Sequence, residues 1–125
     1  MMLWYFSLAL IEKCRTGTDK EEEYMEQIRK NQELQREYAV HSPINYAMYW
    51  TSIEAELAGF DGSPDLLRVG RLYEDALNQA REGNWYFELS IIHECTGAFY
   101  HRLGLYNTAL GYIKKVLFCS FAIRT

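Results

Sequence analysis

The sequence predicts an all-α protein of about six helices, arranged as three consecutive hairpins. Apolar residues recur at helical spacing along the chain, and no segment shows the alternation of apolar and polar residues that is typical of a β-strand. Glycine, proline and asparagine interrupt this pattern between the predicted helices. With 125 residues, 49% of them hydrophobic, residues 1–125 have the size and composition of a single domain or of part of one.

The first predicted helix covers about residues 3–14 and is apolar on most sides, as expected of a helix packed by neighbours on more than one face. A secretory leader is the alternative interpretation, but no basic residue precedes the segment and no small-residue cleavage motif follows it. Its nearly all-apolar stretch, residues 3–11, has nine residues, which are too few to span a bilayer. We therefore expect a buried helix and no membrane partner.

The second predicted helix begins with Asp19 and Glu22, which have the spacing of a capping box. It ends near His41, because Pro43 disfavours helical geometry in the residue before it. Its apolar stripe is narrow, so we expect a half-exposed helix. The first predicted hairpin therefore covers residues 3–41.

The second predicted hairpin covers residues 45–82. After a glycine-rich turn, Ser63 and Pro64 supply an N-cap and a first helical residue for its second helix. Gly83-Asn84 then supplies a left-handed stop. The continuous apolar face of this helix consists of Leu66, Val69, Tyr73, Ala76 and Ala80.

The third predicted hairpin covers residues 85–117 and carries the spacing of a tetratricopeptide repeat. The first glycine of the pattern lets two helices approach closely, and the first tyrosine fills the groove between them. The second glycine turns the chain, and the alanine lets the returning helix pack back. The matching positions are Gly97, Tyr100, Gly104, Tyr106 and Ala109.

The same pattern occurs 40 residues earlier, where Val69, Tyr73 and Ala76 take the places of Ala109, Ile113 and Val116. This period exceeds the usual tetratricopeptide length of about 34 residues. We therefore expect a tetratricopeptide-like α-solenoid of about three helix pairs, with residues 118–125 as an atypical tail. Neither end carries a polar capping helix, so we expect a fragment of a longer array whose apolar ends favour self-association.

Charge and cysteine content exclude several classes of function. The 13 basic and 17 acidic residues give a net charge of −4, so nucleic acid is not an expected partner. The three cysteines are an odd number without a CxxC pair, which argues against a disulfide framework and a structural metal site. A reducing cytoplasm fits this pattern, and we expect no cofactor.

No residue pattern in the chain supports catalysis, so we expect a protein that is not an enzyme. The motifs of phosphate-binding loops, serine hydrolases and zinc proteases are missing. Glu54 and Glu56 are two residues apart and so point to different sides of a helix. His93-Glu94 lacks the continuation of a phospho-accepting motif, and we assign His93 a packing role.

A partner protein is the remaining expectation. In a helical solenoid the concave surface is lined by the first helix of each pair, and aromatic residues are the commonest anchors of an interface. The candidate anchors are Tyr49, Ile53, Trp85 and Tyr86.

Five stretches of the chain together resemble a known family: residues 41–46, 53–58, 72–76, 80–85 and 93–105. They are similar to the tetratricopeptide-like segment of large hybrid sensor histidine kinases, especially the fungal, stress-responsive type. In that family the segment follows a protein-kinase-like domain and a signal-transducing ATPase, and precedes GAF, histidine-kinase and receiver modules. The resemblance implies a non-catalytic spacer and interaction role in two-component signal transduction, because those modules are missing from residues 1–125.

Two alternatives remain open. The first is a free-standing tetratricopeptide-type adaptor that binds a peptide, which should carry a polar final helix. The second is a small helical ligand-binding domain, which requires a closed cavity with converging polar groups.

Overall fold

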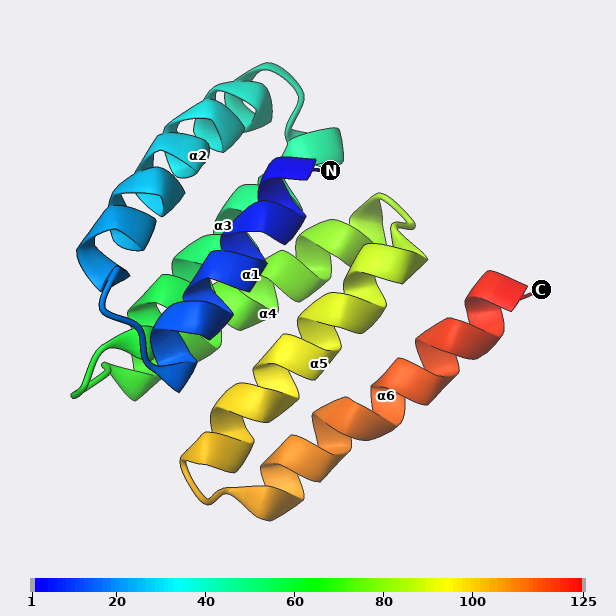
Figure 1. Ribbon diagram of the computed structural model, residues 1–125. Helices are drawn as coiled ribbons and strands as arrows, with labels where there is room; N and C mark the ends of the chain where they lie inside the picture. Colours follow the sequence, from blue (N-terminus) through cyan, green and yellow to red (C-terminus); the bar gives the residue numbers. More distant parts are fainter. Residues whose placement is uncertain (1, 125) are drawn as a thin grey trace.

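The computed structural model describes residues 2–124, with the side chains of 117 and 119–124 left undescribed. Six helices and no strand occur within this range, which confirms the all-α prediction (Figure 1). The helices are α1 (Met2–Thr16), α2 (Glu21–His41), α3 (Pro43–Phe60), α4 (Leu66–Glu82), α5 (Tyr86–Arg102) and α6 (Tyr106–Arg124).

Each helix packs against the next one in the chain, and α3 also contacts α1 and α5. Figure 1 shows α6 alongside α5 at one edge of the molecule. The hydroxyl of Tyr112 in α6 also reaches α4, where it donates a hydrogen bond to Glu74 over 2.6 Å.

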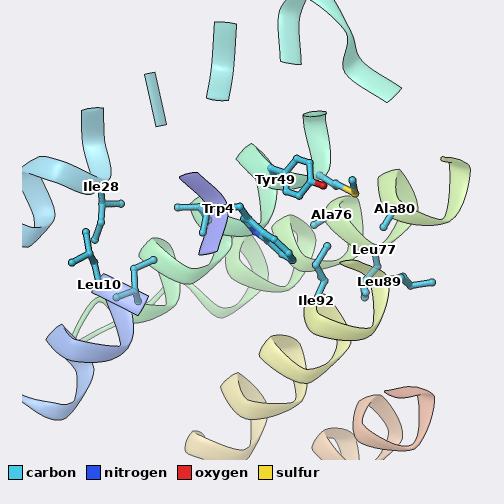
Figure 2. Packing of buried hydrophobic residues seen from close by; sticks show 12 residues of the cluster. Trp4, Leu10, Ile28, Tyr49, Ala76, Leu77, Ala80, Leu89 and Ile92 are labelled. Atoms are coloured by element: carbon cyan, nitrogen blue, oxygen red, sulfur yellow. The ribbon is translucent and has the colours of Figure 1, made fainter. Parts of the chain in front are cut away.

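The main hydrophobic core joins side chains from α1 to α5, and Figure 2 shows its labelled members. Trp4 of α1 is fully buried near the centre, and its indole N–H donates to the hydroxyl of Ser52 over 2.9 Å. Its ring meets Tyr49 of α3 edge-on, with the centroids 5.1 Å apart. A smaller cluster joins α3, α4 and α5 through Ala55, Val69, Tyr73 and Phe99.

Two of the predicted N-caps are wrong. Lys20, not Asp19, is the N-cap of α2, and it makes no side-chain capping bond, so the helix begins one residue later than the capping-box spacing implies. The hydroxyl of Thr18 accepts a hydrogen bond from the Lys20 N–H instead.

Ser63 does not cap α4 either. Its N–H donates to the side chain of Asp61, which holds it in the preceding turn. Asp65 takes over the cap and accepts from the Arg68 N–H over 3.3 Å, so α4 begins at Leu66 and Pro64 lies before it.

Several helix ends differ from the boundaries predicted from the sequence. The break before α3 falls at Ser42 as predicted, but Pro43 already belongs to the helix, since proline suits the first helical position. The left-handed residue after α4 is Asn84, with φ of 56°, whereas Gly83 is right-handed. The backbone of α6 continues to Arg124, beyond the predicted end at residue 117.

Candidate functional site

The residues predicted to pack the repeat differ in their burial. Val69, Tyr73 and Ala76 of α4 are each no more than 1% exposed, and Ala109 of α6 is 3% exposed. Tyr106 at the start of α6 is 63% exposed.

Gly97 and Tyr100 of α5 lie against α6, and Gly104 lies in the connection between these two helices. A Cβ added to Gly97 would lie 3.3 Å from the carbonyl oxygen of Ala109, so the two helices are closely packed there. Tyr100 stacks on Tyr112, with the ring centroids 5.5 Å apart. Gly104 has φ of 80° in the connection, a conformation that glycine adopts without strain.

The four predicted partner anchors do not form one surface. Tyr49 and Ile53 are 5% and 0% exposed in the main core, because α3 is covered by neighbours on several sides. Trp85 donates its indole N–H to the carbonyl oxygen of Ile44, and Tyr86 beside it is 42% exposed. Tyr49 and Ile53 are therefore excluded as anchors, and the prediction of a surface that includes them is wrong.

A cleft of about 260 Å³, here called the α1–α5 cleft, is lined by side chains of α1 and α5, and both helices contact α3. Glu56 is the single α3 residue in its lining. The α1 wall consists of Leu8, Glu12 and Arg15, and the α5 wall of Ile91, Glu94, Cys95, Ala98 and Arg102.

A buried ion pair joins the α1 wall to the floor of the cleft. The Arg15 guanidinium donates to Glu56 and to Glu12, each over 2.8 Å. The side chains of Arg15 and Glu56 are only 19% and 5% exposed. Burial alone lowers the pKa of Arg15, but the hydrogen bonds and charges of Glu56 and Glu12 outweigh it and raise that pKa. Arg15 is thus fixed in one position as a permanent cation.

Two further ionisable groups surround Glu56. Burial raises the pKa of the Cys95 thiol well above its usual value, and the charge of Glu56 adds to the rise. Burial and the same carboxylate also raise the pKa of Tyr73. The Tyr73 hydroxyl has no hydrogen-bond partner among the described residues. Both groups stay protonated at neutral pH, so Cys95 is not an activated nucleophile.

The edge of the cleft carries charged side chains. Glu12, Glu94 and Arg102 are exposed at its edge, where both signs of charge alternate with apolar side chains. Glu54 points away, as its spacing from Glu56 predicted, and accepts a hydrogen bond from Gln32 over 3.3 Å.

The cleft was not predicted from the sequence, although the position of Glu56 indicates a buried charge. Glu56 continues the stripe of Tyr49, Ser52 and Ile53 at helical spacing, so an acidic residue stood on a buried helix face. A buried carboxylate requires a partner, and Arg15 is the one that the fold supplies.

A second cavity, of about 400 Å³, lies between α4, α5 and α6. His93 of α5 is 2% exposed in its lining, and its Nδ1 is buried without a hydrogen-bond partner among the described residues. Burial, aided by the charges of Arg81 and Lys115 and opposed by Glu74, lowers the pKa of His93 to about 4. The other lining residues are Arg81, Tyr86, Leu89, Lys115 and Phe118.

Cys14 and Cys95 are free thiols, and no group of three or more potential metal ligands occurs among the described residues. Along residues 2–124, none of the helices has the length and apolar character needed to cross a bilayer. Comparison with protein-family models, with curated proteins and with solved structures finds no match to this chain.

Proposed function

We propose that this chain is a non-catalytic, tetratricopeptide-like interaction and spacer segment that binds a protein partner in the α1–α5 cleft. The observation that carries the proposal is the cleft itself, which spans two helices that are far apart in sequence and has a fixed cation in its wall. Recognition there depends on packing and charge rather than on a chemical step.

The order of helix contacts supports the repeat part of the proposal. The first helices of the expected pairs, α1, α3 and α5, contact one another in sequence. Each of α2 and α4 also contacts the first helix of the following pair. Such contacts between neighbouring units are what a helical-hairpin solenoid requires.

The chemistry of the cleft indicates a partner segment with both signs of charge. Arg102 suits an acidic side chain, whereas Glu94 and Glu12 suit basic ones. Leu8 and Ile91 provide apolar contact between these charges. A mixed-charge peptide, or such a segment of an adjacent domain, matches this order.

The resemblance to hybrid sensor histidine kinases supplies the setting of the proposal. In that setting the chain separates an ATPase module from the phosphotransfer modules and binds one of them through the cleft. The free-standing adaptor differs in setting, and a cooperative thermal melt of a helical monomer would favour it over the spacer.

A peptide titration tests the cleft. Fluorescence anisotropy with an array of labelled ten-residue peptides, each with acidic, apolar and basic positions, should reveal saturable binding that weakens as salt is added. Ile91→Trp, which fills the cleft from a half-buried position, should weaken that binding at least tenfold, whereas Asn78→Trp on the exposed side of α4 should not. Binding that survives Ile91→Trp, or no binding by any peptide, would refute the proposal.

The cavity at His93 favours a second candidate function, the binding of a small amphipathic acid. Arg81 and Lys115 would attract its anion, and Tyr86, Leu89 and Phe118 would contact its apolar part. Titration with decanoate, followed by NMR of the His93 ring, should raise the pKa of His93. An unchanged His93 titration at saturating decanoate would exclude this candidate.

A further inference from the structure

An apolar groove of about 450 Å³ lies along the C-terminal part of α5 and the first half of α6, whereas the His93 cavity involves the N-terminal half of α5. Three of its large side chains are strongly exposed, namely Tyr106 (63%), Leu110 (50%) and Ile113 (42%). We call it the α5–α6 groove. Its full lining is Gly97, Ala98, His101, Arg102, Tyr106, Ala109, Leu110 and Ile113.

The preceding hairpin has a surface of the same kind, but it is filled. Phe99 of α5 forms a buried cluster with Ala55 of α3 and with Val69 and Tyr73 of α4. A Cβ added to Gly59 would lie 3.0 Å from the Phe99 ring, so the fit is tight. We call Ala55, Gly59, Val69 and Tyr73 the Phe99 contact surface.

Each residue of the Phe99 contact surface has a counterpart in the α5–α6 groove. Between the second helices, α4 and α6, corresponding residues are 40 positions apart. Ala109 and Ile113 are therefore the counterparts of Val69 and Tyr73. Between the first helices, α3 and α5, corresponding residues are 42 positions apart, because the connection after α3 is two residues longer than the one after α5. Gly97 and His101 are therefore the counterparts of Ala55 and Gly59.

The correspondence extends to the neighbouring aromatic residue. A Cβ added to Gly70 would lie 3.0 Å from the hydroxyl of Tyr100. The counterpart of Gly70 is Leu110, which also lines the groove. The α5–α6 groove is therefore the open equivalent of a surface that receives a helix with two adjacent aromatic residues.

Within the chain, α1 exposes such a pair. Tyr5 and Phe6 are 41% and 47% exposed, and Met2 one turn earlier is 86% exposed. The end of the groove is basic at His101 and Arg102, whereas Glu12 on α1 has a side chain that is 61% exposed. Charge and shape therefore both match α1 to the groove.

We propose that the α5–α6 groove binds α1 of a second copy of this chain, running in the direction of α5, with Tyr5 and Phe6 placed as Phe99 and Tyr100 are placed on α3 and α4. Such an interface joins two different surfaces, so each copy keeps one free end. The copies then form open chains that lengthen with concentration. This inference depends on the repeat in the proposed function and not on the α1–α5 cleft.

Complementary variants test the proposal. Sedimentation velocity over a concentration series should show the wild type growing beyond a dimer. Leu110→Glu blocks the groove and Phe6→Glu blocks α1, and each variant alone should stay monomeric. An equimolar mixture retains one intact groove and one intact α1, so it should form one-to-one dimers and stop there. Val40→Glu, at a position that is 71% exposed on α2, should behave as the wild type does.

Several outcomes would overturn the inference. A wild type that is monomeric at every concentration would do so, as would a mixture that fails to pair. Dimers of Phe6→Glu alone would mean that two grooves bind each other. Helicity of each variant is checked by circular dichroism, and Leu110→Gln with Phe6→Gln replaces any variant that fails to fold. Peptide binding in the α1–α5 cleft should be unchanged in Leu110→Glu, which separates the two proposals.

Discussion

The Phe99 contact surface and the α5–α6 groove are made from corresponding residues, but one is buried and the other is open. Val69 and Tyr73 are at most 1% exposed beneath Phe99, whereas Ile113, the counterpart of Tyr73, is 42% exposed. The difference comes from the helix that follows, since α5 covers the first surface. Burial of a residue in a stacked helical hairpin thus depends on the next hairpin as much as on its own.

The largest expected loss of stability comes from removing the side chain that fills the Phe99 contact surface. Phe99→Ala should lower the free energy of unfolding by about 3–5 kcal/mol, because it leaves a cavity among Ala55, Val69 and Tyr73. Ile113→Ala in the open groove should cost about 1 kcal/mol, since much of that side chain is already in water. Urea denaturation of both variants at low protein concentration measures the two costs, and equal costs would contradict the comparison.

Breaking the buried ion pair should have the next largest effect. Arg15→Ala leaves Glu56 buried without its partner and should cost about 3 kcal/mol. Replacing both residues, in Arg15→Met with Glu56→Leu, should recover most of that loss. Denaturant midpoints of the single and double variants provide the measurement, and a double variant as unstable as Arg15→Ala would argue against the pair.

Two glycines allow a finer comparison of the filled and open surfaces. Gly59→Ala brings a Cβ against the buried Phe99 ring and should cost about 1–3 kcal/mol. Gly97→Ala meets the Cδ1 of the exposed Ile113, which can move away, and the backbone carbonyl oxygen of Ala109 at 3.3 Å, which moves only with α6. Alanine favours a helix by about 1 kcal/mol over glycine, which offsets part of this cost. The net effect of Gly97→Ala in thermal melts should be below about 1 kcal/mol. Equal losses in the two variants would show that the open groove is as rigid as the filled surface.

An effect of pH on stability is also expected. His93 has a folded pKa of about 4 against an ordinary value of 6.5, so the unfolded chain binds the proton more readily. Its contribution to stability is therefore present above pH 6.5 and is lost as the pH falls towards 4. The slope is at most about 1.4 kcal/mol per pH unit. Denaturation at pH 7, 6 and 5 should show a weaker dependence in His93→Gln, and identical slopes would exclude this role.

The number and positions of the helices could be predicted from the sequence, because glycine, proline and asparagine mark the connections. The caps could not be predicted to the residue. Ser63 and Asp65 both favour an N-cap, and only the folded turn, where Asp61 holds the Ser63 N–H, selects Asp65.

The sides of the helices were harder to predict than their ends. α3 is apolar around most of its circumference, so its sequence does not separate an exposed face from a buried one. Tyr49 and Ile53 were assigned to a surface because the first helix of each pair was expected to line it, although α1, α2 and α4 all pack against α3. The α1–α5 cleft depends on Arg15 meeting Glu56, 41 residues away, and such a pairing is set by packing rather than by local pattern.

The order of helix contacts also bears on how the chain folds. Every pair of described helices in contact is adjacent in the chain or separated by one helix, and the hydrogen bond from Trp4 to Ser52 spans 48 residues. Contacts this local require little loop closure before they form, which is typical of fast-folding helical proteins. Because α6 packs mainly on α5, native-state hydrogen exchange should find the α6 amides opening first, while those around Trp4 exchange only when the whole chain unfolds.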